Sequence, residues 1–150
     1  VFGSIEDYVA TIEQAVIRLE QSTGLAPLVV AHSMGGLAAR RWWVDTNIER
    51  IHHLITLGTP HHGTWLARWA RSENARQMQI GSPWRDTLVE AEGEFRRARI
   101  TCFYSHCDNI VFPASTATLA GASNRHIAAV AHVHMVDHPA PLQEALRRLR

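Results

Sequence analysis

The chain has few cysteines, no long apolar run and no dominant charge. Its two cysteines, Cys102 and Cys107, are too few for a disulfide framework, so we expect two free thiols, with a bond between them as the alternative. No apolar run approaches the roughly 18 residues that span a membrane, and no signal peptide opens the chain. The formal charge is +1 and the arginines are scattered, which gives no reason to expect nucleic acid as a partner. The compartment stays open.

The chain also lacks an initiator methionine and begins with "VFGSIEDY". We therefore expect an N-terminal part of a longer protein before Val1. The length of 150 residues and the apolar content of 46% predict a globular chain with a sizeable core. We expect residues 1–150 to form one domain that is the C-terminal portion of a larger one.

Apolar spacing predicts helices that alternate with strands. Ser4 opens a helix whose apolar residues recur every three or four positions until Gly24. Such alternation predicts an α/β fold, with a mostly parallel sheet and helices on both faces. The first strand is apolar enough to be central, so we expect further strands from sequence before Val1. The predicted strands are 28–31, 51–57, 100–104 and 126–130, and later helices cover 35–44 and 141–149.

Two other segments carry apolar residues at helical spacing. In the last helix we expect Leu142, Ala145, Leu146 and Leu149 to face inward. Residues 61–99 are irregular, and their Trp65, Leu66 and Trp69 stand at helical spacing. These three side chains belong either to the core or to an apolar wall on the surface.

The stretch "PLVVAHSMGGLAAR" places Ser33 between a buried strand and a helix. A sharp turn of this kind forces strained backbone angles on the serine, so its neighbours must be small, as Ala31 and Gly35 are. The turn also leaves the Met34 N–H at a helix N-terminus, where it can donate to a developing negative charge. The competing interpretation is that Ser33 only caps the helix.

Three polar residues follow the carboxyl ends of predicted strands, where functional groups of open α/β sheets collect. They are Ser33, Asp108 and His132, in the chain order nucleophile, acid, base. A serine hydroxyl attacks only when a base takes its proton and a third group orients that base. The pattern therefore predicts a Ser-His-Asp triad.

Each partner of the serine has rivals. Asp86 and Asp137 compete with Asp108 for the acid, although only Asp108 follows a strand, and Asp108 could otherwise lie in a simple turn. His134 competes with His132 for the base.

Four segments resemble α/β-hydrolase lipases and esterases of bacteria, in the same order along almost the whole chain. "AHSMGG" resembles the nucleophile elbow in the variant with alanine as its first small residue, and "LITLGTPHHGTWLA" resembles the strand and loop that follow. "FYSHCDNIVFP" resembles the segment of the triad acid, and "HIAAVAHVHMVDHP" that of the triad histidine. The resemblance implies an α/β-hydrolase fold that lacks its N-terminal strands here.

The resemblance implies a serine hydrolase that cleaves carboxylic esters through an acyl-enzyme. Ser33 would be the nucleophile, His132 the base, Asp108 the orienting acid and the Met34 N–H one oxyanion donor. The family's second oxyanion donor lies in a His-Gly loop that we expect before Val1. An acyltransferase of the same fold, or a non-catalytic binding domain, is the alternative.

The resemblance also places groups around the substrate. His32, His61 and Trp65 are tentative substrate-binding residues, and residues 61–99 are a possible lid or cap. We expect a small ester or lipid substrate, with a lipid or membrane surface as a possible partner, and no cofactor. The adjacent pair His61 and His62 has no carboxylate or cysteine at ligand spacing, so we expect no metal. The oligomeric state stays open.

Overall fold

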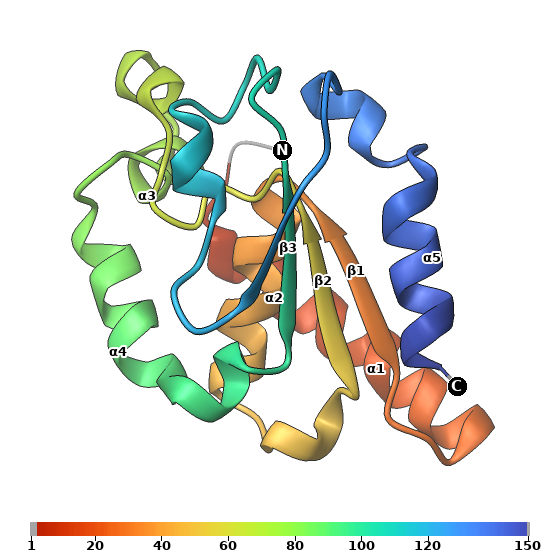
Figure 1. The fold of residues 1–150 in the computed structure, drawn as a ribbon. Helices are drawn as coiled ribbons and strands as arrows, with labels where there is room; N and C mark the ends of the chain where they lie inside the picture. Colours follow the sequence, from red (N-terminus) through yellow and green to blue (C-terminus); the bar gives the residue numbers. More distant parts are fainter. Residues whose placement is uncertain (1–2, 150) are drawn as a thin grey trace.

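A computed structural model describes residues 3–149, in which four strands form one sheet. Figure 1 shows helices on both faces of this sheet. All neighbouring strands are parallel and follow the order β1-β2-β3-β4. Because parallel strands end at the same edge of a sheet, the loops that follow them meet at one end of the molecule. The strands are β1 (Leu28–His32), β2 (His53–Leu57), β3 (Ile100–Tyr104) and β4 (Ser123–His126).

Helices α1, α2 and α4 lie on one side of the sheet and α5 covers the other side (Figure 1). No helix in residues 3–149 is long and apolar enough to cross a membrane. The α-helices are α1 (Val9–Thr23), α2 (Met34–Val44), α3 (Glu73–Gln77), α4 (Pro83–Arg97) and α5 (Pro139–Arg148). The 3-10 helices are η1 (Ile5–Tyr8), η2 (Ile48–Arg50), η3 (Trp65–Trp69), η4 (Ala114–Ala117) and η5 (His132–Met135).

Two apolar clusters hold these layers together, one on each face of the sheet. Successive side chains of a strand point to opposite faces, so Leu54 packs with Trp42 of α2, whereas Ile55 packs with Ala145 of α5. Leu54 and Ile55 are fully buried, and burying a side chain of this size stabilises a fold by about 1.5–3 kcal/mol. The two-faced burial confirms the predicted α/β architecture.

The first predicted strand lies at an edge of the described sheet, and the last one differs from the observed strand. Within the described sheet, strand β1 pairs with β2 alone, and Val30 at its middle is 51% exposed, so its other edge is free for the further strands that we expect before Val1. The fourth strand covers Ser123–His126 instead of 126–130. Ala129 adopts a φ of +58°, which an extended strand does not allow, so the apolar run after Ile127 becomes a loop.

Helix α5 turns the opposite way from the prediction. Leu142, Leu146 and Leu149 are exposed by 63%, 51% and 66%, and of the expected inward residues only Ala145 is buried. The same helix directs Glu144 inward, where its carboxylate accepts a hydrogen bond from the Thr101 hydroxyl at 3.4 Å. Helix α5 therefore directs Glu144 toward the sheet and its leucine stripe away from it.

Residues 61–99 contain two structurally different parts. Helix α4 buries Leu88 against α2 and sends the carboxylate of Glu92 to Arg40 of α2, so it is built into the core. Helix η3 before it carries exposed aromatic side chains.

The two cysteines are free thiols; Cys102 is buried in β3 and Cys107 is exposed.

Candidate active site

Ser33 forms a strained turn between β1 and α2. Its backbone angles, φ of +55° and ψ of −131°, lie outside the regions that residues other than glycine prefer, as expected for a nucleophile elbow. The turn is fixed from β2, because the Ser33 N–H donates to the Leu57 carbonyl at 2.8 Å and the Thr59 hydroxyl donates to the Ser33 carbonyl at 2.9 Å. A Cβ on Gly36 would lie 2.1 Å from the Thr59 hydroxyl, so only glycine fits there.

Asp108 and His132 form a buried hydrogen-bonded pair. His132 Nδ1 lies 2.9 Å from Asp108 Oδ2 and 3.1 Å from Oδ1. Burial alone would raise the pKa of Asp108, but the hydrogen bond from His132 and those from the Val111 and Ile110 N–H groups outweigh burial and lower it. Asp108 is therefore a carboxylate at neutral pH, and it orients the ring so that Nδ1 carries the proton.

The remaining contacts leave one ring nitrogen of His132 open. The backbone N–H of His132 donates to the Asn109 side chain at 3.2 Å, and Nε2 has no hydrogen-bond partner within residues 3–149. The Ser33 hydroxyl likewise makes no hydrogen bond to any described residue. The structure thus joins two of the three expected triad residues, and the Ser33 hydroxyl is not hydrogen-bonded to them, which is common in the absence of substrate.

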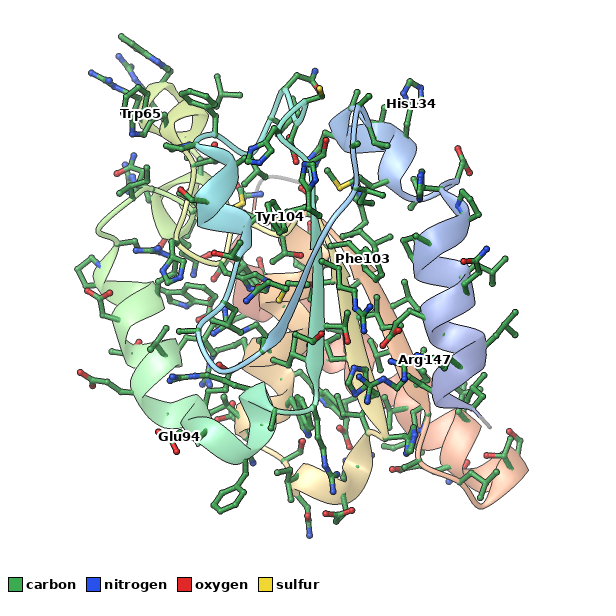
Figure 2. All side chains as sticks on the ribbon, viewed as in Figure 1. Trp65, Glu94, Phe103, Tyr104, His134 and Arg147 are labelled. Atoms are coloured by element: carbon green, nitrogen blue, oxygen red, sulfur yellow. The ribbon has the colours of Figure 1, made fainter. Side chains whose placement is uncertain are left out.

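The rival residues lie elsewhere. Asp86 and Asp137 are exposed and make no hydrogen bond to His132, and His134 is exposed at the end of the sheet where Figure 2 also shows Trp65. Of Asp86, Asp108 and Asp137, only Asp108 is paired with a histidine side chain among the described residues.

Gly58 is a site residue that sequence reasoning missed. It follows β2 with a φ of +53°, and a Cβ there would lie 3.0 Å from both Asp108 Oδ2 and His132 Nδ1. Any larger residue would push this pair apart. The sequence signal was the Gly58-Thr59-Pro60 turn, which marks a strand end but not a close approach.

An open pocket of about 280 Å³ adjoins the loop after β3 that carries Asp108 and Asn109, here called the acid loop. Trp65 is 54% exposed at this pocket and meets Phe112 edge to face, with ring centroids 5.5 Å apart. Leu66 and Trp69 are exposed by 48% and 78%, so these side chains form a surface wall and not core. The pocket is lined by Trp65, Leu66, Arg68, Trp69, Asp108, Asn109 and Phe112.

His61 does not reach this pocket. It is fully buried, with Nδ1 3.1 Å from Arg40 Nη1 and Nε2 3.0 Å from the Thr56 hydroxyl. Burial, and then the charge of Arg40, lower the pKa of His61 well below its usual value. The expected contact with substrate is therefore not possible for His61, which instead joins the loop after β2 to the core.

His32 lies beside the acid–base pair. Its ring contacts the His132 ring, with centroids 4.5 Å apart, and its Nε2 lies 3.0 Å from the His132 carbonyl oxygen.

Within the described residues, no three or more His, Cys, Asp or Glu side chains are placed to hold a metal ion.

Comparisons with known proteins identify a family and a fold. The family model described as "PGAP1-like alpha/beta domain" matches residues 5–136. A search of curated protein sequences found no match.

Solved structures of lipases share the fold at low identity. The mature lipase BlEst2 of Bacillus licheniformis superposes with a TM-score of 0.80 at 18% identity, over 97% of this chain and 75% of that one. Lipase B of Aspergillus fumigatus gives 0.69 at 24% identity, over 83% of this chain and 34% of that one. A monoacylglycerol lipase of Paleococcus ferrophilus gives 0.62 at 13% identity, over 98% and 77%. The chain thus has the α/β-hydrolase fold.

Proposed function

Because the chain belongs to the PGAP1-like alpha/beta domain family, we propose that it is a serine hydrolase of carboxylic esters. The observation that carries this proposal is the buried His132–Asp108 pair, whose Nε2 is open at the end of the sheet that also holds the strained Ser33. A carboxylate, an oriented imidazole and a nucleophile elbow are the parts that acyl transfer requires.

In the proposed reaction, His132 Nε2 takes the proton of Ser33 as its oxygen attacks the ester carbonyl. The Met34 N–H, in the first turn of α2 where N–H groups have no partner within the helix, donates to the oxyanion. The imidazolium then gives its proton to the leaving alcohol, and an acyl group stays on Ser33. Water attacks this acyl-enzyme by the same path, and the acid is released. Asp108 stabilises the imidazolium in both steps.

The aromatic wall supports an ester with an apolar acyl chain. Trp65, Leu66 and Trp69 border the pocket beside Asp108, and the Arg68 guanidinium stacks over the Trp69 ring at 4.8 Å. Exposed aromatic rings next to arginine fit an acyl chain or a lipid–water surface. We propose that η3 forms the substrate side of the site as part of a lid or cap.

The test is hydrolysis of p-nitrophenyl esters of increasing acyl length by the wild type and by Ser33→Ala. We expect activity in the wild type and none above background in Ser33→Ala, whereas Ser115→Ala, at an exposed serine, keeps full activity. Trp65→Ala should raise KM for long acyl chains and leave acetyl esters unchanged. Hydrolysis by Ser33→Ala at the rate of the wild type would disprove the proposal.

Adding an alcohol acceptor separates hydrolysis from transfer. A hydrolase gives mainly free acid under these conditions, whereas a transferase gives mainly the new ester. The triad chemistry is the same for both acceptors, so the two reactions differ only in their products. Mass spectrometry of the products therefore distinguishes them.

A further inference from the structure

His32 occupies a position that the proposed reaction does not use. It is the last residue of β1 and directly precedes Ser33, so its backbone belongs to the nucleophile elbow. Its side chain is partly buried and reaches across to the turn that carries His132, 100 residues later in the chain. No periodicity or motif in the sequence connects these two turns.

The contact consists of a hydrogen bond and a ring contact. His32 Nε2 lies 3.0 Å from the His132 backbone carbonyl oxygen, and the two ring planes are inclined by 46° with centroids 4.5 Å apart. Because a carbonyl oxygen only accepts hydrogen bonds, Nε2 of His32 carries the proton and donates it. His32 is therefore held in one tautomer by a backbone group of His132.

His132 is thus held from three sides. Asp108 binds its Nδ1, Asn109 accepts its backbone N–H at 3.2 Å, and His32 donates to its carbonyl. The first two contacts come from the acid loop, and only the third comes from the elbow that carries the nucleophile. We propose that His32 is a positioning residue that fixes the distance between His132 Nε2 and Ser33 Oγ. This inference rests on the proposed function.

The charge state of His32 fits this role. Burial lowers its pKa, and the neighbouring His132 ring lowers it further, against the opposing effects of the His132 carbonyl and of Asp108. His32 is therefore neutral at neutral pH and keeps the donor on Nε2. A neutral ring can also lie against the imidazolium that forms on His132 during acyl transfer, whereas a charged one would repel it.

The experiment uses two variants that separate the hydrogen bond from the ring. His32→Phe keeps a ring of similar shape and removes the donor, whereas His32→Gln removes the ring and keeps an N–H donor. His134→Phe, at an exposed histidine of η5, is the matched control. For each protein we measure the rate of labelling by a fluorophosphonate, kcat and KM for one ester, and the thermal midpoint.

We expect His32→Phe to lower the labelling rate and kcat by about 10- to 100-fold, because a small misplacement of a reacting group costs this much. KM should stay close to the wild-type value, His32→Gln should recover most of the rate, and His134→Phe should match the wild type. Wild-type labelling in His32→Phe, equal losses in His32→Phe and His32→Gln, or a change in KM alone would overturn the inference.

Imidazole NMR of ¹⁵N-histidine-labelled wild type separates this inference from the proposed function. The Nε2–H tautomer of His32 should appear whether or not the protein turns over esters, and the Nδ1–H tautomer would overturn the inference. A wild type with the expected tautomer but no labelling would instead remove the serine-hydrolase proposal.

Discussion

Two buried histidines of this protein have opposite electrostatic surroundings. His132 is 4% exposed and its Nδ1 faces the Asp108 carboxylate at 2.9 Å. His61 is 0% exposed and its Nδ1 lies 3.1 Å from a guanidinium nitrogen of Arg40. Both follow strands of the same sheet, in loops that meet at its carboxyl end.

The charge of the partner, acting together with burial, assigns a different role to each histidine. A carboxylate stabilises an imidazolium, so a histidine beside it can take up and release a proton. A guanidinium opposes that charge, and the Arg40 charge is itself balanced by two hydrogen bonds to Glu92 at 2.7 and 2.8 Å. His61 is thus a neutral structural group, and the proposal gives the proton transfer to His132.

The largest effect should come from removing the histidine beside the carboxylate. We expect His132→Ala to lower kcat for ester hydrolysis by roughly 10⁶-fold, as loss of the base does in serine hydrolases with a triad. His134→Ala, two residues away and exposed, should keep wild-type activity. Initial rates on p-nitrophenyl esters measure both variants. A larger loss in His134→Ala would reverse the assignment of the base.

The next effect comes from removing the charge of Asp108 while keeping its shape. Asp108→Asn should lower kcat by about 10⁴-fold, because an amide does not hold the ring in the required tautomer. The matched control is Asp137→Asn, at an exposed aspartate. The same rate assay reports the loss, and a fall smaller than tenfold would show that Asp108 is not the orienting acid.

Breaking the second network should change stability and not chemistry. Glu92→Gln leaves the fully buried Arg40 without its charge partner, which costs about 3–5 kcal/mol in the free energy of unfolding. Glu90→Gln on the exposed side of the same helix should lie within about 0.5 kcal/mol of the wild type. Urea denaturation measures both. An unchanged midpoint for Glu92→Gln would contradict the assigned role of this pair.

The smallest effect is a pH dependence that belongs to His61. Its pKa in the folded protein is far below that of the unfolded chain, so between pH 7 and 5 the unfolded state takes up a proton that the folded state excludes. Stability is therefore lost as the pH falls. His61→Gln should reduce this slope by up to about 1.4 kcal/mol per pH unit. Parallel stability curves for the two proteins, from urea melts at several pH values, would contradict the assignment.

Apolar runs made the first three strands of the sheet predictable, and side-chain direction was harder. Strands 28–31, 51–57 and 100–104 were predicted at nearly their observed bounds, because a parallel strand is apolar on both faces. The run after His126 has the same composition but contains Ala129 with a positive φ. In α5 the leucine spacing predicted the wrong face, since hydropathy does not reveal that Glu144 is paired inward.

Pairings across the fold could not be predicted from spacing. Asp108 and His132 could be named because each follows a strand end, and their hydrogen bond is now visible, although their roles stay proposals. The bond from Arg40 to Glu92 joins residues 52 positions apart, and nothing in a sequence with 15 basic side chains indicates which one is buried. The sequence likewise does not show that His61 is buried against Arg40, so the resemblance alone placed His61 near the substrate.

The most direct test of the central claim is mass spectrometry of the protein after fluorophosphonate treatment. Peptide mapping identifies the residue that forms the covalent adduct. We expect a single adduct on Ser33 in the wild type, none in Ser33→Ala, and strongly slowed formation in His132→Ala. An adduct on another residue, or one that persists in Ser33→Ala, would contradict it.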